Sequence, residues 1–309
     1  MKTSVSIAGL TLKNPVMTAS GTCGYGLDLA HFYDLSRLGA LVVKGISVLP
    51  RSGNPPPRVV ETCGGMLNAI GLQNVGMDSF IRDVLPALRH YRMPLIVNIL
   101  GESEEEYSTL AEALGNQEGV GGLEVNVSCP NVEKGGISFG ADPDALERLV
   151  RALRQRTGRP LLIKLSPNVT DIVDMAVRAE AAGADGLTLI NTLRGMAIDL
   201  KSRRPCLGTV VGGLSGPAIK PIALRMVWEV TRRVRIPVVG VGGILCAEDA
   251  LEFLVCGATA VQVGTAHFRN PCACIEVIEG IEAYLVMNQI KDIGELIGSL
   301  KVERKLRPA

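Results

Sequence analysis

Eight short runs of apolar, mostly β-branched residues alternate with helix-like stretches along the 309 residues of this chain. The runs cover residues 15–20, 41–44, 95–98, 123–127, 161–165, 187–191, 238–241 and 260–263. Seven are apolar almost throughout, as buried parallel strands are, whereas the run at 123–127 carries the polar Glu124 and Asn126. Eight alternating units predict an α/β fold, a (β/α)8 TIM barrel.

The alternative is a doubly wound parallel sheet. That fold more often places a GxGxxG motif after its first strand, but residues 19–24 read Ala-Ser-Gly-Thr-Cys-Gly. The barrel is therefore the favoured architecture.

Several of the helix-like stretches have recognisable ends. The sequence Ser-Glu-Glu-Glu at 103–106 is a capping box, and its helix is expected to stop near Gly115. Asp142 followed by Pro143 predicts the start of another helix, which Gly158 closes. Further helices are expected at 169–182, 217–234 and 247–256.

Three segments exceed a minimal barrel. Residues 4–12 predict an N-terminal hairpin with its turn at Ala8-Gly9, capping the bottom of the barrel. Residues 51–73 and 192–216 follow the second and sixth strands, so they are insertions at the C-terminal face, where barrel active sites are built. No repeat or linker divides the chain, and residues 1–309 are expected to form a single domain.

Composition excludes several classes of protein. A net charge of +1 provides no basic field for nucleic acid. No stretch approaches the roughly 18 apolar residues of a membrane span, and the first residues lack a signal-peptide core, so a cytoplasmic location is expected. The eight cysteines form no CxxC pair and no zinc-like cluster with histidine, which predicts reduced thiols, no metal site and no iron–sulfur cluster in this chain.

Polar residues end the predicted strands in phase, which places them together at the C-terminal face of a barrel. The first six strands end at Ser20, Lys44, Asn98, Asn126, Lys164 and Asn191. The last two end at Gly242-Gly243 and Gly264-Thr265. Loops after strands 7 and 8 commonly bind phosphate through backbone N–H groups, and phosphate binding is favoured over simple tight turns.

The two lysines and the asparagines suggest what else is bound. Lys44 and Lys164 either pair with a buried carboxylate, reach the surface or neutralise a ligand. Few acids sit at the neighbouring strand ends, which favours an anionic ligand such as a flavin hydroquinone or a substrate carboxylate. Amide side chains suit a heterocycle with imide groups; the candidates are Asn68, Asn98, Asn126, Asn131 and Asn191, although Asn68 and Asn131 also suit turns.

Cys129 lies just past the fourth strand, before Pro130 and a glycine-rich segment that could act as a lid. A thiol there could be a general base, a nucleophile or a small packing residue. His31 and His90 lie in or next to predicted helices, and His267 lies just past the eighth strand on the side assigned to phosphate. Because no histidine is then the obvious base, a chemical role for Cys129 is favoured.

Four motifs together resemble the dihydroorotate dehydrogenases. They are Asn-Val-Ser-Cys-Pro-Asn at 126–131, Asn-Ala-Ile-Gly-Leu-Gln-Asn at 68–74, Leu-Ile-Lys-Leu-Ser-Pro at 162–167 and Val-Gly-Gly-Ile at 241–244. The resemblance implies an FMN-containing barrel that oxidises (S)-dihydroorotate to orotate in pyrimidine synthesis. Cysteine at 129 is similar to the soluble class 1 enzymes, since the membrane-linked class 2 enzymes use serine and carry an N-terminal extension.

The loop at 68–74 resembles the NAD-linked class 1B catalytic subunit more than the fumarate-linked class 1A enzymes. That likeness implies a partner subunit with FAD and a [2Fe–2S] cluster, and a homodimer within a heterotetramer. Electrons would then pass through the partner to NAD⁺.

The resemblance also implies residue roles. Cys129 would take the C5 proton of dihydroorotate while hydride leaves C6 for flavin N5, and Lys164 would stabilise negative charge on the flavin. The FMN-binding residues would be Ala19, Ser20, Gly21, Lys44, Gly45, Asn98, Asn126, Lys164, Ile190, Gly216, Gly242, Gly243, Gly264 and Thr265. The substrate-binding residues would be Lys44, Asn68, Ala69, Ile70, Gly71, Leu72, Asn126, Asn191 and Thr192.

Other interpretations stay open from the sequence. They are a class 1A enzyme, another FMN barrel such as a tRNA dihydrouridine synthase, a flavin-free phosphate-binding barrel, and a scaffold that docks a redox partner. The near-neutral charge counts against a tRNA substrate.

Overall fold

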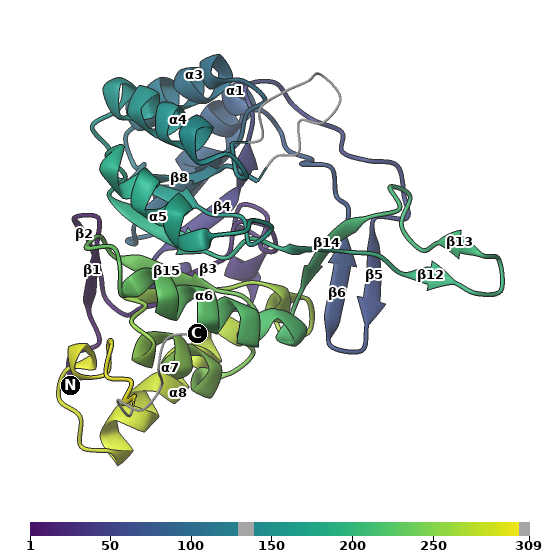
Figure 1. Ribbon diagram of the computed structural model, residues 1–309. Coiled ribbons are helices and arrows are strands. Elements are labelled where there is room, and N and C mark those ends of the chain that lie inside the picture. The colour runs from purple at the N-terminus through teal and green to yellow at the C-terminus, as the bar shows by residue number, and fades with distance from the viewer. Residues whose placement is uncertain (129–138, 303–309) are drawn as a thin grey trace.

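The computed structural model describes residues 1–128 and 139–302, and Figure 1 shows a ring of parallel strands surrounded by helices. Eight parallel strands form one sheet, in the order β4-β7-β8-β9-β10-β15-β16-β3. Their bounds are β3 Val16–Thr18, β4 Leu41–Ile46, β7 Leu95–Ile99, β8 Gly122–Asn126, β9 Leu161–Lys164, β10 Gly186–Leu189, β15 Val238–Val241 and β16 Ala260–Val263. A parallel bridge between Met17 and Ala40 joins the two outer strands, so the barrel closes. The predicted (β/α)8 barrel is confirmed, and the doubly wound alternative is excluded.

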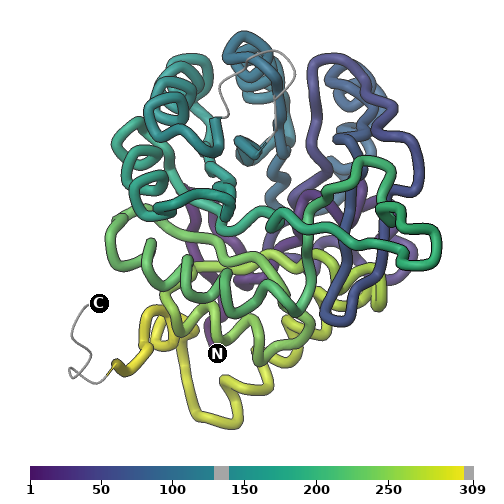
Figure 2. Tube along the Cα trace, turned by 45° about the vertical axis from the view of Figure 1, so that its right-hand side comes forward, coloured from purple at the N-terminus to yellow at the C-terminus, as the bar shows by residue number. Residues whose placement is uncertain are grey.

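Helices cover the outside of the barrel (Figures 1 and 2). The α-helices are α1 Met77–Ser79, α2 Leu85–Leu88, α3 Glu104–Gly115, α4 Pro143–Arg156, α5 Ile172–Ala181, α6 Lys220–Thr231, α7 Ala247–Val255 and α8 Ala273–Met287. The short helical turns are η1 Leu29–His31, η2 Leu35–Arg37, η3 Phe80–Val84, η4 Pro217–Ile219, η5 Thr265–Phe268 and η6 Ile293–Glu295. Apolar side chains of strands and helices pack into one buried core between the two layers.

The helix ends follow the capping chemistry, with two corrections. Ser103 caps α3 by accepting from the Glu106 N–H, and Asp142 caps α4, both as predicted. The helix expected at 169–182 begins only at Ile172, because the Asp171 carboxylate caps it there. The helix expected at 217–234 divides into η4 and α6, and α6 ends at Thr231.

The N-terminal hairpin is present as predicted, with β1 Val5–Ile7 paired to β2 Leu10–Leu12. The two insertions also form strands, which the sequence did not reveal. Residues of both build a four-stranded antiparallel sheet, ordered β11-β14-β6-β5, and a separate hairpin β12–β13 extends beyond it (Figure 1). Their bounds are β5 Val59–Thr62, β6 Gly65–Asn68, β11 Leu193–Gly195, β12 Ile198–Asp199, β13 Arg204–Pro205 and β14 Gly212–Ser215.

In the described part of the chain, no helix combines the length and the apolar character that crossing a membrane requires. The same residues hold no cluster of three or more histidine, cysteine or acidic side chains able to bind a metal ion.

Candidate active site

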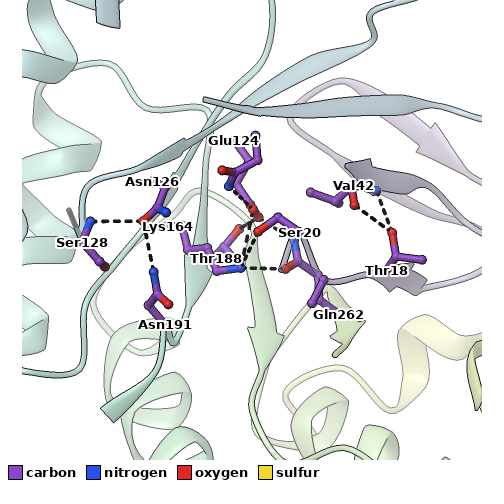
Figure 3. A network of polar contacts seen from close by, with 12 residues as sticks. Thr18, Ser20, Val42, Glu124, Asn126, Ser128, Lys164, Thr188, Asn191 and Gln262 are labelled. Atoms are coloured by element: carbon purple, nitrogen blue, oxygen red, sulfur yellow. Dashed lines mark hydrogen bonds and ion pairs between the residues drawn. The ribbon is translucent and has the colours of Figure 1, made fainter. Parts of the chain in front are cut away.

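A layer of polar side chains crosses the interior of the barrel near the C-terminal ends of the strands (Figure 3). At its centre the Glu124 carboxylate, on β8, has no solvent exposure. It accepts hydrogen bonds from the Asn98 amide (2.8 Å), the Thr188 hydroxyl (3.0 Å) and the Gln262 amide (2.6 Å). These donors come from β7, β10 and β16, so one carboxylate connects four strands.

Lys164, at the end of β9, belongs to the same layer. Its ammonium nitrogen lies 3.6 Å from Glu124 Oε1 and donates to the Ser20 hydroxyl (3.3 Å) and to Gln262 Oε1 (3.4 Å). Lys164 therefore pairs with a buried carboxylate, one of the alternatives left open for the two lysines, although few acids sit at the neighbouring strand ends. Glu124 lies two residues before the end of β8, and its side chain points into the barrel, where it reaches the ammonium group.

Lys44 contrasts with Lys164. It lies within β4 and is half-buried, and its ammonium makes no hydrogen bond or ion pair with any residue that the structure describes. Burial lowers the pKa of this lysine, because the charged form loses its hydration. A half-buried cation without a partner suits an anionic ligand.

Two asparagines meet near Lys164, which pairs with Asn126 in the register of β8 and β9. Asn126 Oδ1 accepts from the Asn191 amide (3.0 Å) and from the Ser128 N–H (3.2 Å), while Asn191 Oδ1 accepts from the Thr192 N–H (2.8 Å). The Ser128 hydroxyl is buried and has no partner among the described residues. Donors and acceptors thus stay available next to this pair, as recognition of a polar ring requires.

The loop at 69–72 is held in place by Asn54, an earlier residue of the same insertion. Asn54 donates to the Ala69 carbonyl through its amide and to the Ile70 carbonyl through its N–H (both 3.0 Å). Gly71 and Leu72 have φ angles of 75° and 58°, the left-handed region that a branched residue such as leucine adopts only under constraint. Asn68, which precedes the loop, donates to the Gly213 carbonyl of β14 (3.2 Å).

The glycines after β15 and β16, where a phosphate site is predicted, have unusual backbone angles and unpaired N–H groups in the described part of the chain. Gly242 and Gly243 have φ angles of 134° and 79°, which an L-residue rarely adopts. The N–H groups of Gly242, Gly243 and Gly264 donate to no carbonyl in the described part of the chain, and Gly242 is buried. Unpaired, partly buried N–H donors at this position can bind an anion.

The remaining predicted residues surround these groups. Thr265 donates to the Ser215 hydroxyl (2.8 Å), and Gly216 follows β14 directly. Ala19, Ser20 and Ile190 are buried just past their strands, Gly45 lies in β4, and Gly21 is exposed. Cys129 and Asn131 lie outside the described residues, so their roles stay predictions.

His267 is buried in η5, which follows Gly264 directly. Its Nδ1 lies 3.3 Å from the Thr22 hydroxyl and its Nε2 lies 3.3 Å from the Cys274 sulfur. Burial lowers the pKa of His267 to about 4, so the ring is neutral at pH 7.

Sequence reasoning missed three residues of the polar layer. Glu124 was recognised only as a polar exception, and Thr188 and Gln262 were not identified at all. The available signal was one polar side chain inside each otherwise apolar strand, since such a residue must find a buried partner.

Comparison with known proteins agrees with this geometry. The family model described as dihydroorotate dehydrogenase matches residues 2–285. The curated protein named "Dihydroorotate dehydrogenase B (NAD(+)), catalytic subunit" of Geotalea uraniireducens is 59% identical over 297 residues, 96% of this chain and 97% of that protein. Proteins of the same name from Trichlorobacter lovleyi and Geobacter metallireducens are 59% and 58% identical, over 96% and 97% of this chain and 98% of each relative.

Proposed function

This chain belongs to the dihydroorotate dehydrogenase family, and from that membership we propose that it oxidises dihydroorotate to orotate in pyrimidine biosynthesis, with NAD⁺ as final electron acceptor. The near-complete match to relatives named as the catalytic subunit of the NAD⁺-linked enzyme supports the NAD⁺-linked class over the fumarate-linked one. The observation that carries the proposal is the pair of buried or half-buried lysines beside an amide cluster at one end of the barrel.

FMN is the proposed cofactor. The unpaired N–H groups of Gly242, Gly243 and Gly264 fit its phosphate, and Lys164 supplies positive charge at the barrel centre. When bound, the flavin accepts the hydride that dihydroorotate loses. We assign the surrounding contacts to the FMN-binding residues predicted from the sequence, with Ser20 and Asn98 at the polar layer.

The substrate contacts follow from chemistry. Lys44 has no hydrogen-bond or ion-pair partner among the residues that the structure describes, which suits the substrate carboxylate. Asn68, Asn126, Asn191 and Thr192 supply amides and a hydroxyl for the ring, and the loop at 69–72 supplies backbone groups. Cys129 is the proposed base that removes the C5 proton.

The partner is the least direct part of the proposal. The words "catalytic subunit" in the names of the relatives support a second, electron-transfer subunit, for which FAD and a [2Fe–2S] cluster are proposed. A homodimer within a heterotetramer and a cytoplasmic location complete the proposal.

Anaerobic addition of dihydroorotate to the purified, FMN-loaded chain tests the function. The flavin absorbance should bleach in one turnover and orotate should form in equal amount. A flavin that stays oxidised, or a chain that binds no FMN, would refute the proposal.

The same preparation tests the electron path. The chain alone should reduce an artificial dye but reduce NAD⁺ poorly, because no GxGxxG follows a strand to bind a second dinucleotide. Robust NAD⁺ reduction by the single chain would contradict the two-subunit arrangement.

A further inference from the structure

The charge balance of the polar layer is unusually simple. Glu124 is fully buried, and the Lys164 side chain is 7% exposed. Among the described residues, Lys164 forms an ion pair with no other acid, and Glu124 forms one with no other base. The two charges therefore balance one another inside the barrel.

The hydrogen bonds show that the carboxylate does not need lysine to satisfy its acceptors. Asn98, Thr188 and Gln262 already donate to both of its oxygens at 2.6–3.0 Å, whereas the ammonium lies at 3.6 Å. Lys164, by contrast, depends on Glu124 for its counter-charge. The other partners of Lys164, Ser20 and Gln262, are neutral and lie at 3.3 and 3.4 Å.

Gln262 fixes the geometry of the pair. Its amide nitrogen donates to Glu124 while its amide oxygen accepts from Lys164, so each end of the amide faces the charge it can bind (Figure 3). Glutamate and lysine are thus joined both directly and through a neutral bridge.

Stability alone explains this arrangement poorly. A buried ion pair is seldom better than apolar side chains of the same volume, because both charges lose their hydration. A fixed charge near a reacting group is the better explanation for a pair at the catalytic end of a barrel.

We propose that Glu124 is a positioning residue, which supplies the fixed counter-charge that holds the Lys164 ammonium in place beside the flavin. This inference rests on the function proposed above, in which Lys164 stabilises negative charge on the reduced flavin. The two lysines then differ in kind: Lys44 meets its counter-charge only in a ligand, whereas Lys164 carries its own.

The test compares the FMN-loaded full chain with its Glu124→Gln variant. The midpoint potential of the bound flavin is measured by dye equilibration, and its reduction by dihydroorotate is followed by stopped flow. Without the carboxylate the Lys164 ammonium has no acid among the described residues to hold it in place, so it should move away from the flavin. The potential should then fall and reduction should slow about 10–100-fold, toward Lys164→Met, which should slow it about 10²–10³-fold.

The double variant separates positioning from a merely structural role. In the Lys164→Met background, Glu124→Gln removes an unpaired negative charge, so the potential should rise instead of falling. A rise in both backgrounds, or an equal fall in both, would overturn the proposal. The double variant replaces the ion pair by two neutral side chains of similar volume. Its comparison with Lys164→Met therefore tests the proposal even if Glu124→Gln alone does not fold. Equal midpoint potentials in these two variants would overturn the proposal.

Glu147→Gln is the matched control. Glu147 also forms ion pairs, with Arg151 and Arg178, but on the outer helix α4, so this variant should keep the wild-type potential and rate. The potentials need no substrate. A wild-type chain whose flavin is not reduced by dihydroorotate would refute the proposed function. The midpoint potentials of the bound flavin would still test the role proposed for Glu124.

Discussion

Gly264 differs from Gly242 and Gly243, the other glycines of the proposed phosphate site, because its φ angle is −119°, outside the left-handed region. A Cβ atom there would approach the Ala19 Cβ to 3.3 Å, a tight but adjustable contact. At Gly243, by contrast, φ is 79° and a Cβ would lie 2.7 Å from the Lys220 Cβ, so substitution there strains the backbone with or without a ligand. Gly264 is therefore the better place to test phosphate binding.

Gly264→Val should weaken FMN binding by at least about tenfold while leaving the fold intact, because a side chain would occupy the space next to the free N–H groups. Fluorescence titration measures the affinity and circular dichroism checks the fold. Gly158→Val is the control, since a Cβ at Gly158 meets no atom within 4 Å. Unchanged FMN affinity in Gly264→Val would remove Gly264 from the binding site.

Cys129→Ala should bind FMN and orotate almost normally but reduce its flavin about 10²–10⁴-fold more slowly, the usual cost of losing a general base. A free thiol has a pKa of about 8.5, so wild-type reduction should accelerate as the pH rises toward that value. Cys63→Ala, at an exposed position between β5 and β6, is the matched control. Wild-type rates in Cys129→Ala at every pH would show that another group removes the proton.

His267 predicts a dependence of stability on pH. Its folded-state pKa is about 4, depressed by burial below the ordinary value of 6.5. Between these values the unfolded chain binds a proton that the folded chain does not, so the free energy of unfolding falls as the pH falls, by up to about 3 kcal/mol from this group. At pH 7 this penalty is absent.

Urea unfolding of His267→Gln at pH 7 and pH 4.5 measures that contribution. The variant should lose less stability than the wild type over this interval, whereas His31→Gln, at an exposed histidine, should behave as the wild type does. Equal losses in wild type and His267→Gln would exclude the linkage.

Individual elements show which sequence signals were sufficient. The strands were found because continuous apolar runs of four to six residues between helical patterns leave little choice. The strands of the insertions were missed because residues 66–68 pair with 213–215, nearly 150 positions away, which no local pattern reveals. The strand-end residues were predictable because each follows its own apolar run in the sequence. The contact of Lys164 with Glu124 was not, because it required the register of β8 and β9.

Helix α5 allows one such element to be tested. Asp171 accepts from the N–H groups of Val173 (2.8 Å) and Asp174 (3.1 Å), and it sets the start that the sequence placed three residues early. Asp171→Ala should lower the free energy of unfolding by about 1 kcal/mol, while Asp171→Asn, which retains a capping oxygen, should lower it much less. If alanine and asparagine are equivalent in urea unfolding, the cap does not stabilise the helix.

For the whole molecule, closure of the barrel is concentrated at one seam. Strands β3 and β4 lack the regular ladder of the other strand pairs: at this seam the backbone contributes the bridge between Met17 and Ala40 and the Gly39 N–H, which donates to the Val16 carbonyl (2.9 Å). The Thr18 side chain supplies contacts that a neighbouring backbone would otherwise make. Its hydroxyl donates to the Val42 carbonyl (3.0 Å) and accepts from the Val42 N–H (2.9 Å), with all of these groups fully buried (Figure 3). The two outer strands of the barrel sheet, β3 and β4, are therefore joined through this hydroxyl.

Thr18→Val keeps the shape of the side chain but leaves the Val42 N–H without a partner, while the carbonyl retains only the weak Cys23 thiol donor at 3.6 Å. An orphaned buried group costs about 1–3 kcal/mol, so the free energy of unfolding should fall by about 2–4 kcal/mol in urea titrations. Thr18→Ser, which keeps the hydroxyl, should lose less than half of that, and Thr11→Val, on the exposed face of β2, should be near neutral.

Because the seam joins the first and second strands of the ring, Thr18→Val should also weaken FMN binding, since Ser20 and Lys44 lie just beyond it on the same two strands. A stable Thr18→Val chain with wild-type FMN affinity would show that the remaining seven strand pairs hold the barrel closed without this contact.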